Sequence, residues 1–353
     1  METERLKQIK VHAQAIAELL YEETESEKVK TLEGIEVVVR KHLIDYVNPE
    51  IGKFFISASS GTKAGRKRIL KSILGYLTIS EKQAQKLKVK DRTRLSPYLE
   101  KCCLLLSANE SYQRAEEDVK VLTGMEVSHG TQHRIVHRQD FKLLEASTKV
   151  SEMSIDGGKV RLRTPQGQPC QWKDYKGVNL HGLGVEAFFQ NNDLLVEWVN
   201  QQRFSNPLIC LGDGHQGIWN IFAKINNCEQ RREILDWYHL VENLGKIGGS
   251  LKRLDLVETL LWKGKVDLAI EKLADWKHQK VSNFIAYLNK HRHRIVNYDY
   301  YQSEGISIGS GTIESTIKQI GRRIKISGSQ WNSENVSQVL YHRCAYLNGY
   351  FST

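Results

Sequence analysis

A short apolar segment, followed by a glycine–aspartate–glycine turn and then an amphipathic segment, constrains the fold of this chain more than any other feature. The apolar segment is Leu208 to Leu211, the turn is Gly212-Asp213-Gly214, and residues 218–225 carry apolar side chains at helical spacing. The pattern predicts a buried strand, a tight turn and a helix, with Asp213 at the end of the strand. Ligands bind beyond the strand ends of open α/β sheets because helices leave that crevice uncovered. Asp213 is therefore a candidate ligand-binding residue, with an Asx turn or a helix N-cap as the alternative.

The composition adds a preference for polyanionic partners. The chain has 353 residues, 40% hydrophobic and 26% charged, which is enough to bury a core and to form two or three domains. Its net charge is +10, with a pI near 9.1, and such an excess favours nucleic acid first among polyanions. The six cysteines form no CxxC pair. We therefore expect reduced core thiols rather than disulfides or a zinc site.

We expect residues 1–94 to form a helical region with a basic loop. The first 46 residues carry apolar stripes at helical spacing, of the kind that packs against a partner helix or a second copy. Residues 57–65 are rich in serine, alanine and glycine, which predicts a loop, and Arg66, Lys67 and Arg68 follow it. We interpret these three cations as phosphate contacts, with a solvated charged surface as the alternative.

Residues 95–148 carry three successive helical patterns. The last two are joined by residues 123–128, which include Gly124, and Ser128 can cap a short helix from His129 to Arg138. Two helices joined by a glycine-containing turn are typical of a helix-turn-helix, in which the second helix lies in the major groove of DNA. A helix pair with no role in DNA binding is the alternative. The face predicted to contact DNA carries Gln132, His133, Arg134 and Arg138.

From residue 149 to residue 353 we expect an α/β domain. Residues 152–163 predict a strand, a turn at Gly157-Gly158 and a second strand, and residues 178–188 predict a third. Three antiparallel strands followed by alternating helices and parallel strands are typical of a ribonuclease-H-like core, where the strands of Asp156 and Asp213 are neighbours. The later elements are a helix at 193–201, a strand at 208–211, the helix after Asp213, and a strand at 232–236.

A third acidic residue follows a long helical insertion. Residues 240–305 predict only helices, and a glycine- and serine-rich loop then leads into a helix at 312–323 with Glu314 in its first turn. If Asp156, Asp213 and Glu314 meet, all three are ionised at neutral pH, because their ordinary pKa values are about 3.9 and 4.3. Two Mg²⁺ or Mn²⁺ ions would offset the repulsion and support phosphodiester cleavage or transfer. Taken singly, each acid is equally well explained as a surface or capping carboxylate.

Four short motifs follow one another in a fixed order: Ser154-Ile-Asp-Gly-Gly158, Leu211-Gly-Asp-Gly214, Asp236-Trp-Tyr-His239 and Gly311-Thr-Ile-Glu-Ser315. Together they resemble the catalytic core of bacterial insertion-sequence transposases of the DDE class, in particular the ISKra-type group, which is related to the mutator-like elements. The resemblance covers about residues 95–345. It implies that Asp156, Asp213 and Glu314 are the ligands of two metal ions per active site. Asp236 and His239 match a further signature of the family, which implies an accessory role for Asp236 and an active-site role for His239. A polar residue with no catalytic role is the alternative for His239.

The same resemblance implies what the chain does and where. It would be a transposase that binds the terminal inverted repeats of its insertion sequence and catalyses two-metal DNA cleavage and strand transfer. We expect such a protein to be cytoplasmic and nucleoid-associated, at least dimeric, and without a membrane partner. The sequence shows neither a signal-peptide pattern nor an apolar run of about 20 residues, which agrees with this expectation. The cations expected to hold the DNA backbone beside the acids are Lys318, Arg322, Arg323 and Lys325.

Three alternatives and one departure remain. A transposase-derived DNA-binding protein would bind without turnover, a ribonuclease-H-like nuclease would cut without joining, and a glycosidase would use paired carboxylates. The basic charge and the predicted helix-turn-helix argue against the glycosidase. Members of the family often carry a cysteine-rich zinc-binding segment before the helix-turn-helix, whereas residues 47–95 here contain no cysteine. If such a segment recognises transposon ends, recognition in this chain must rest elsewhere.

Overall fold

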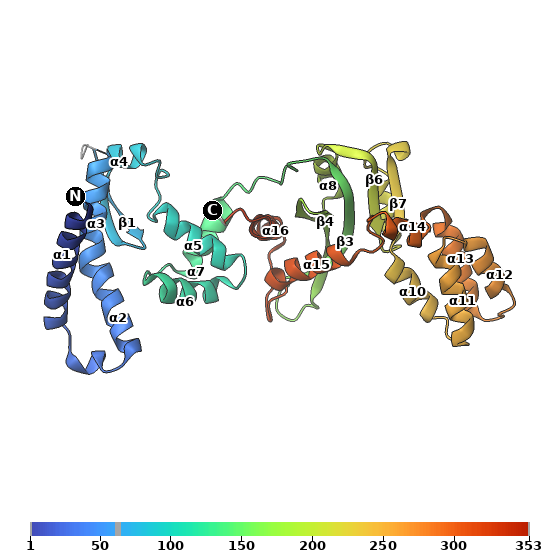
Figure 1. Cartoon of the computed structure of the whole chain (residues 1–353), viewed down its shortest axis with the longest axis horizontal. Coiled ribbons are helices and arrows are strands. Elements are labelled where there is room, and N and C mark those ends of the chain that lie inside the picture. Colours follow the sequence, from blue (N-terminus) through green and yellow to red (C-terminus); the bar gives the residue numbers. More distant parts are fainter. Residues whose placement is uncertain (1, 61–64, 352–353) are drawn as a thin grey trace. The chain divides into compact units, whose positions relative to one another are not determined.

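The computed structural model describes residues 2–60 and 65–351, and the chain divides into two compact units (Figure 1). The first unit comprises residues 1–107 and 111–135, and the second comprises residues 108–110 and 136–353. The chain is of mixed α/β class and 56% helical, which confirms the predicted class. In the described ranges, no helix has both the length and the apolar character needed to cross a membrane.

The first unit combines helices with one two-stranded sheet. Residues predicted as loop from 57 to 60 belong to a helix instead, and residues 61–64 of that prediction lie outside the described residues. Lys67 and Arg68, which follow the predicted loop, lie on a strand, for which the sequence analysis made no prediction. The elements are α1 (Glu2–Glu22), α2 (Leu32–His42), the π-helical turn η2 (Leu43–Val47), α3 (Asn48–Ser60), β1 (Lys67–Ser72), β2 (Gly75–Ser80), α4 (Glu81–Lys86), α5 (Pro97–Ser107), α6 (Tyr112–Thr123) and most of α7 (His129–Arg138).

The basic run begins a strand that continues through Ile69 and Leu70 and pairs with a second strand, whose apolar residues Leu77 and Ile79 recur at a spacing of two. Strand β1 pairs with β2 in antiparallel register, from Lys67 opposite Ser80 to Ser72 opposite Gly75. Leu70 and Ile79 point to one face, where they form a small core with Ala84. The opposite face of the hairpin carries the more exposed side chains, among them Lys67, Ile69 and Tyr76, as alternation in a half-buried sheet requires.

The three helices predicted between residues 95 and 148 are present. α6 begins at the N-cap Ser111 and ends at Gly124, which has φ +72° and donates its N–H to the carbonyl of Lys120. A left-handed glycine is a common helix terminator because it lacks the Cβ that disfavours this conformation. α7 begins directly after Ser128 and has the predicted bounds.

The second unit is built on a five-stranded mixed sheet. Strands β3, β4 and β5 are antiparallel, whereas β6 and β7 run parallel to β3, in the order β5-β4-β3-β6-β7. Ser154 of β3 pairs with Leu211 of β6, so the strands that carry Asp156 and Asp213 are neighbours, as predicted. The strands are β3 (Val150–Leu162), β4 (Gln171–Leu180), β5 (Gly184–Phe189), β6 (Phe204–Gly212) and β7 (Arg231–Leu235).

The turn predicted at Gly157-Gly158 is wrong, because β3 continues through both glycines. Gly158 lies opposite Tyr175 of β4, and a Cβ added at Gly158 would overlap the tyrosine ring. The glycine pair therefore admits an aromatic ring from the next strand instead of reversing the chain. The third predicted strand is likewise divided, since residues 181–183 form a turn between β4 and β5.

Helices cover both faces of this sheet (Figure 1). Met153 and Ile155 of β3 pack on one face with Trp198 and Trp219, in the larger core. Val160 and Leu162 are at even positions of the strand, whereas Met153 and Ile155 are at odd ones, and they pack on the other face with residues of α15 and α16. The helices are α8 (Asn192–Asn200), α9 (Gln216–Phe222), α10 (Trp237–Gly245), α11 (Leu251–Trp262), α12 (Val266–Ala274), α13 (Gln279–His291), α14 (Tyr298–Ser303), α15 (Gly311–Ile324) and α16 (Ser333–Leu347).

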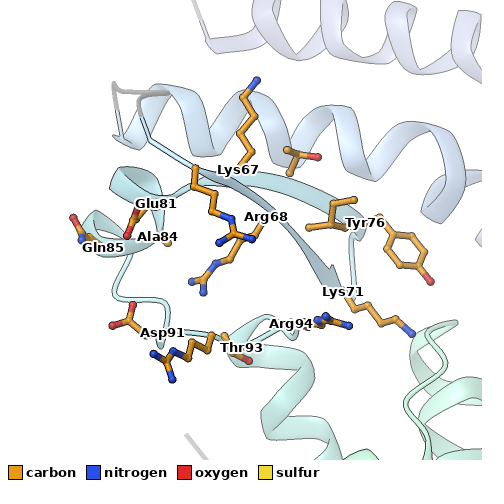
Figure 2. A pocket seen from close by; sticks show the side chains of 14 residues that line it. Lys67, Arg68, Lys71, Tyr76, Glu81, Ala84, Gln85, Asp91, Thr93 and Arg94 are labelled. Carbon is orange, nitrogen blue, oxygen red and sulfur yellow. The ribbon is translucent and has the colours of Figure 1, made fainter.

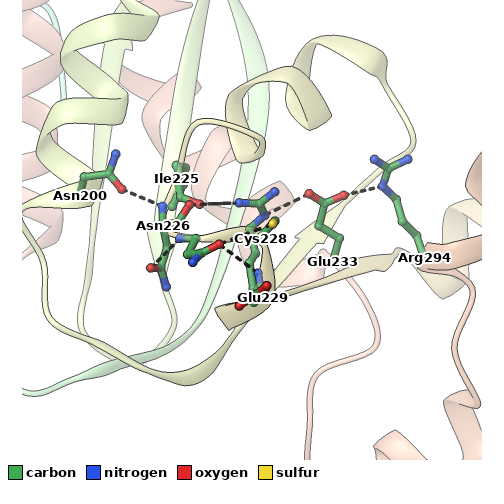
Figure 3. A network of polar contacts seen from close by, with 9 residues as sticks. Asn200, Ile225, Asn226, Cys228, Glu229, Glu233 and Arg294 are labelled. Atoms are coloured by element: carbon green, nitrogen blue, oxygen red, sulfur yellow. Dashed lines mark hydrogen bonds and ion pairs between the residues drawn. The ribbon is translucent and has the colours of Figure 1, made fainter.

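The stretch of residues 240–305 contains only helices among its regular elements, as predicted, and a largely buried charge cluster attaches it to the sheet (Figure 3). Glu233 of β7 accepts from Arg231 Nε at 3.0 Å and from Arg294 Nε at 2.7 Å, and its side chain is 13% exposed. The Arg294 guanidinium also lies 4.2 Å from the ring centroid of Trp219 in α9. A shared carboxylate between two arginines removes the cost of burying either charge alone. The 3-10 turn Arg292–Arg294, which follows α13, is thereby fixed against β7.

Candidate active site

Asp236 is the centre of the hydrogen-bond network at the strand ends. It directly follows β7, and its side chain is fully buried. Its Oδ1 accepts from the backbone N–H of His239 at 2.7 Å, and its Oδ2 accepts from the N–H of Ser310. Its own N–H donates to the carbonyl of Gly212 at 2.9 Å. One residue therefore connects the tip of β6, the start of α10 and the start of α15.

These contacts keep Asp236 ionised in spite of its burial. Burial alone would raise the pKa of Asp236, but the hydrogen bonds from His239 and Ser310 outweigh it, and the pKa lies below its ordinary value. A carboxylate that accepts several N–H groups is favoured in its charged form. Asp236 is thus a fixed negative charge in the interior.

Glu314 reaches the sheet because α15 packs unusually close to β4. Its N–H bonds to the carbonyl of Ser310, which places it in the first turn of the helix as predicted. One turn later, Ile317 lies so close to Gly177 that a Cβ on this glycine would be 2.5 Å from its methyl carbon. Asn179 Nδ2 also donates to Thr316 Oγ1 at 2.8 Å. Gly177 is the cross-strand partner of Asp156, so this contact brings the acidic turn of α15 beside Asp156.

Asp156 experiences the charges of the other two predicted metal ligands. Its pKa is raised, first by burial and then by the negative charges of Asp213 and Glu314, against the lowering effect of the Gly157 N–H and of Lys176. Coulombic effects of this kind require charges that are close together in a poorly solvated region. The three acids, 57 and 101 positions apart in the sequence, therefore lie within electrostatic reach of one another.

Asp213 lies where the sequence pattern predicts, in the turn immediately after β6. Its Oδ1 accepts from the N–H of His215 at 2.8 Å, so the alternative of an Asx turn is also present. Its second oxygen accepts no hydrogen bond from a described residue. Both flanking glycines are required. A Cβ added to Gly212 would lie 2.9 Å from the Trp219 ring, and a Cβ added to Gly214, which has φ +97°, would lie 2.6 Å from Tyr287 Oη. The turn therefore uses one oxygen of Asp213 and leaves the other for a ligand.

The donor set fits divalent cations that prefer oxygen ligands. Three carboxylates offer only oxygen, which suits Mg²⁺ and Mn²⁺. The raised pKa of Asp156 reflects its burial first and the charges of Asp213 and Glu314 to a smaller extent, and a bound cation would oppose both effects. In the part of the chain that the structure describes, no group of three His, Cys, Asp or Glu side chains is spaced closely enough to form a finished metal cluster. The fit therefore rests on the chemistry of the carboxylates and their mutual repulsion.

His239 supplies a positive charge to this acidic region. Its Nδ1 is 3.2 Å from Asp236 Oδ1 and 3.9 Å from Glu314 Oε1, a geometry that is closer to an ion pair than to an aligned hydrogen bond. The interaction with Asp236, and to a smaller extent the charges of Asp213 and Glu314, raise the pKa of His239 to about 9 against the effect of burial. The imidazole is therefore protonated at neutral pH, which offsets part of the carboxylate charge.

Two features of this region were not predicted by the sequence analysis. Tyr287 of α13 places a buried hydroxyl against Gly214, where it makes no aligned hydrogen bond with a described residue. Burial raises the pKa of Tyr287 to about 12 against the lowering effect of the Asn243 side chain, and the nearby charges of Asp213 and Asp236 raise it further. Tyr287 lies in the insertion, 73 positions after Gly214, so no local pattern could have placed it there.

The second feature is a polar relay on β3 that holds the loop before α15. Ser154 Oγ is 2.9 Å from His181 Nε2, His181 Nδ1 is 3.2 Å from Glu152 Oε2, and Glu152 Oε1 accepts from the Ser307 N–H at 3.4 Å. The residue types match a hydrolytic triad, but Ser154 is fully buried and could not attack a substrate. The relay is structural. The alternation of Glu152, Ser154 and Asp156 along one face of the strand was the available signal.

Two of the predicted DNA contacts are wrong because their side chains are buried. Gln132 is fully buried, and its amide donates to the carbonyl of Val127 at 3.1 Å. Arg323 is 1% exposed, and its guanidinium lies 5.0 Å from the centroid of Trp331. Both positions fall on the apolar stripe of their helix, a placement that charge and local pattern did not reveal. His133 is half-buried edge-on to Tyr112, while Arg134, Arg138, Lys318, Arg322 and Lys325 are exposed.

Comparison with known proteins does not assign a function to this site. No model of a known protein family matches the chain, and a search of curated proteins gives no match. The function is therefore argued from the site alone.

Proposed function

We propose that this chain is a transposase of the DDE class, which binds the terminal inverted repeats of its insertion sequence and catalyses metal-dependent DNA cleavage and strand transfer. The observation that carries the proposal is the placement of Asp156 on β3 and of Asp213 directly after the neighbouring strand β6, with Glu314 in the first turn of the helix that packs against Gly177, the cross-strand partner of Asp156. The order of the five strands supports a ribonuclease-H-like core. The pair α6 and α7, joined through Gly124, supports a helix-turn-helix.

The three acids would hold two Mg²⁺ or Mn²⁺ ions through their carboxylate oxygens. Such ions, when bound, lower the pKa of an attacking water or 3′-hydroxyl and stabilise the leaving oxygen. His239, charged at neutral pH, would donate a hydrogen bond to the scissile phosphate and orient it. Asp236 touches no substrate in this proposal; it positions His239 and the first turn of α15.

The exposed face of α15 would guide the DNA backbone to the acids. Lys318, Arg322 and Lys325 recur at spacings of four and three on this helix, and all three are exposed. Lys318 Nζ is 3.9 Å from Glu314 Oε2, so the row of cations begins at the proposed metal site. Contacts of this kind supply a salt-dependent, sequence-independent part of DNA affinity.

We propose further that the protein acts as at least a dimer on DNA in the cytoplasm, associated with the nucleoid. α1 supports self-association because its apolar side chains are exposed in the single chain: Ile9 is 63% and Leu19 is 64% exposed. Exposed apolar rows of this kind mark contact surfaces between proteins.

The decisive experiment compares the native protein with Asp213→Asn on labelled DNA that carries the ends of the element, with Mg²⁺ or Mn²⁺ against a chelator. We expect metal-dependent nicking at the ends and joining to a second DNA, both lost in the variant. The matched control is Asp174→Asn, which makes the same change at an exposed carboxylate on β4 and should retain activity. Nicking without joining would replace the proposal with a nuclease. Tight binding with no turnover, even from a pre-cut end, would replace it with a DNA-binding protein.

A further inference from the structure

A basic groove lies in the first unit, within residues 66–94 (Figure 2). It has a volume of about 1020 Å³ and is bordered by β1, β2, α4 and the loop of residues 91–94. Six cationic side chains line it and only two acidic ones, Glu81 and Asp91. The cations are Arg66, Lys67, Arg68, Lys71, Arg92 and Arg94. We call this feature the ribbon groove.

Most cations of the ribbon groove have no carboxylate partner among the described residues. Arg66, Lys67, Arg92 and Arg94 form no ion pair with any described residue. Arg68 donates to the carbonyl of Lys90 at 3.1 Å, which fixes its guanidinium but leaves its charge uncompensated. Uncompensated like charges gathered in one concavity repel one another, and a bound polyanion removes that repulsion.

The shape of the ribbon groove suits a duplex. The face of the β1–β2 hairpin opposite its small core presents Lys67, Ile69 and Lys71 on one strand and Tyr76 and Thr78 on the other. A two-stranded ribbon with such a face fits the major groove of B-form DNA, with cations at its margins facing phosphates. Tyr76 is the one aromatic ring that lines the groove. Single-strand binding sites instead use a series of stacking rings.

Arg92 is held in an unfavourable backbone conformation at the edge of the ribbon groove. Its φ is +58°, in the left-handed region that residues with a Cβ seldom adopt. The conformation costs about 1 kcal/mol relative to glycine. The chain therefore carries a cation here at a position where a glycine would make a more stable turn.

We propose that the ribbon groove is a second DNA-binding site, which grips the phosphate backbone of duplex DNA without metal and without the carboxylates of the second unit. The inference rests on the proposed function in that DNA is the same substrate. It does not rest on catalysis. Its consequence is that much of the salt-dependent affinity of the chain resides in the first unit rather than beside Glu314.

The test measures DNA binding by the full chain in the presence of a chelator. The readout is the fluorescence anisotropy of a labelled duplex over a range of salt concentrations. The variant is Lys67→Ala/Arg92→Gly/Arg94→Ala. Arg92→Gly removes the cation while relieving the left-handed strain, so thermal unfolding separates lost binding from lost folding. The control removes three exposed cations of α1 in the same unit, Arg5→Ala/Lys7→Ala/Lys10→Ala.

Loss of three phosphate contacts should reduce the slope of log K against log salt by about 2 to 3, and should weaken binding at least about tenfold at about 0.1 M salt. The α1 control should keep the native slope and affinity. An unchanged slope in the groove variant would overturn the proposal. So would single-stranded DNA binding more tightly than duplex in a groove-dependent way.

The outcome is separable from that of the proposed function. If the native protein fails to cleave DNA but loses duplex binding in the groove variant, the ribbon groove stands and the transposase proposal falls. If cleavage depends on Asp213 while the groove variant binds like the native protein, the reverse holds.

Discussion

Replacing Asp236 by asparagine tests the network that arranges the site. Both carboxylate oxygens of Asp236 accept backbone N–H groups, from His239 and from Ser310. An amide has one oxygen and one NH₂ group, so in either orientation one of these N–H donors faces another donor. The substitution also removes the negative charge beside the Nδ1 of His239.

The expected cost follows from these contacts. A hydrogen bond to a charged acceptor contributes about 1.5–3 kcal/mol, and a buried N–H left without an acceptor adds about 1–3 kcal/mol. Because relaxation recovers part of this sum, we expect Asp236→Asn to lower the free energy of unfolding by about 3 kcal/mol. That corresponds to a fall in melting temperature of roughly 5–10 °C for a unit of this size.

The assay is urea unfolding followed by tryptophan fluorescence, since Trp219 and Trp237 are buried in the core beside the network. Asp174→Asn is the matched control, because this exposed residue should change stability by less than about 0.5 kcal/mol. The same experiment, with the histidine followed by NMR, should show the pKa of His239 falling from about 9 towards its ordinary value. An Asp236→Asn protein as stable as the control would refute the argument that this network holds the strand ends together.

Three further predictions address the second unit. Burial raises the pKa of Glu186 from 4.5 to about 7, so the native state loses stability as the pH rises through that interval. Glu186→Gln should therefore be more stable than the native protein by up to about 3 kcal/mol at pH 8 and little different at pH 4; an equal difference in urea unfolding at both pH values would contradict the pKa. Gly177→Ala forces Ile317 and α15 away from the sheet and should cost about 1–3 kcal/mol, with partial recovery in Gly177→Ala/Ile317→Val; no recovery would place the strain elsewhere. Tyr287→Phe removes a buried hydroxyl whose nearby side-chain partner, Asn243, is not aligned for a hydrogen bond, so the melting temperature should be unchanged or raised; a loss above about 1 kcal/mol would show that the hydroxyl bonds to Asn243.

The positions of many elements could be predicted from local pattern. The strand, turn and helix around Asp213, the bounds of α7 and the place of Glu314 in the first turn of α15 all follow from apolar periodicity and capping residues. The adjacency of β3 and β6 could also be predicted from the order of the strands, because few topologies combine three antiparallel strands with parallel strands after them. These features depend on residues close together in the sequence or on rules of connection.

Only the tertiary structure decided what lies beside each residue. The glycine pair at 157–158 has the composition of a turn, yet a tyrosine ring from the next strand requires it in mid-strand. Gln132 and Arg323 have the chemistry of DNA contacts, yet the packing of their helices buries them. The link from Asp236 to Ser310 spans 74 positions, and the gathering of the three acids depends on the close approach of α15 to Gly177. Local pattern determines where helices and strands form because their hydrogen bonds and apolar stripes are local. Long-range packing determines which side chains contact one another, and no single segment of the sequence encodes that packing.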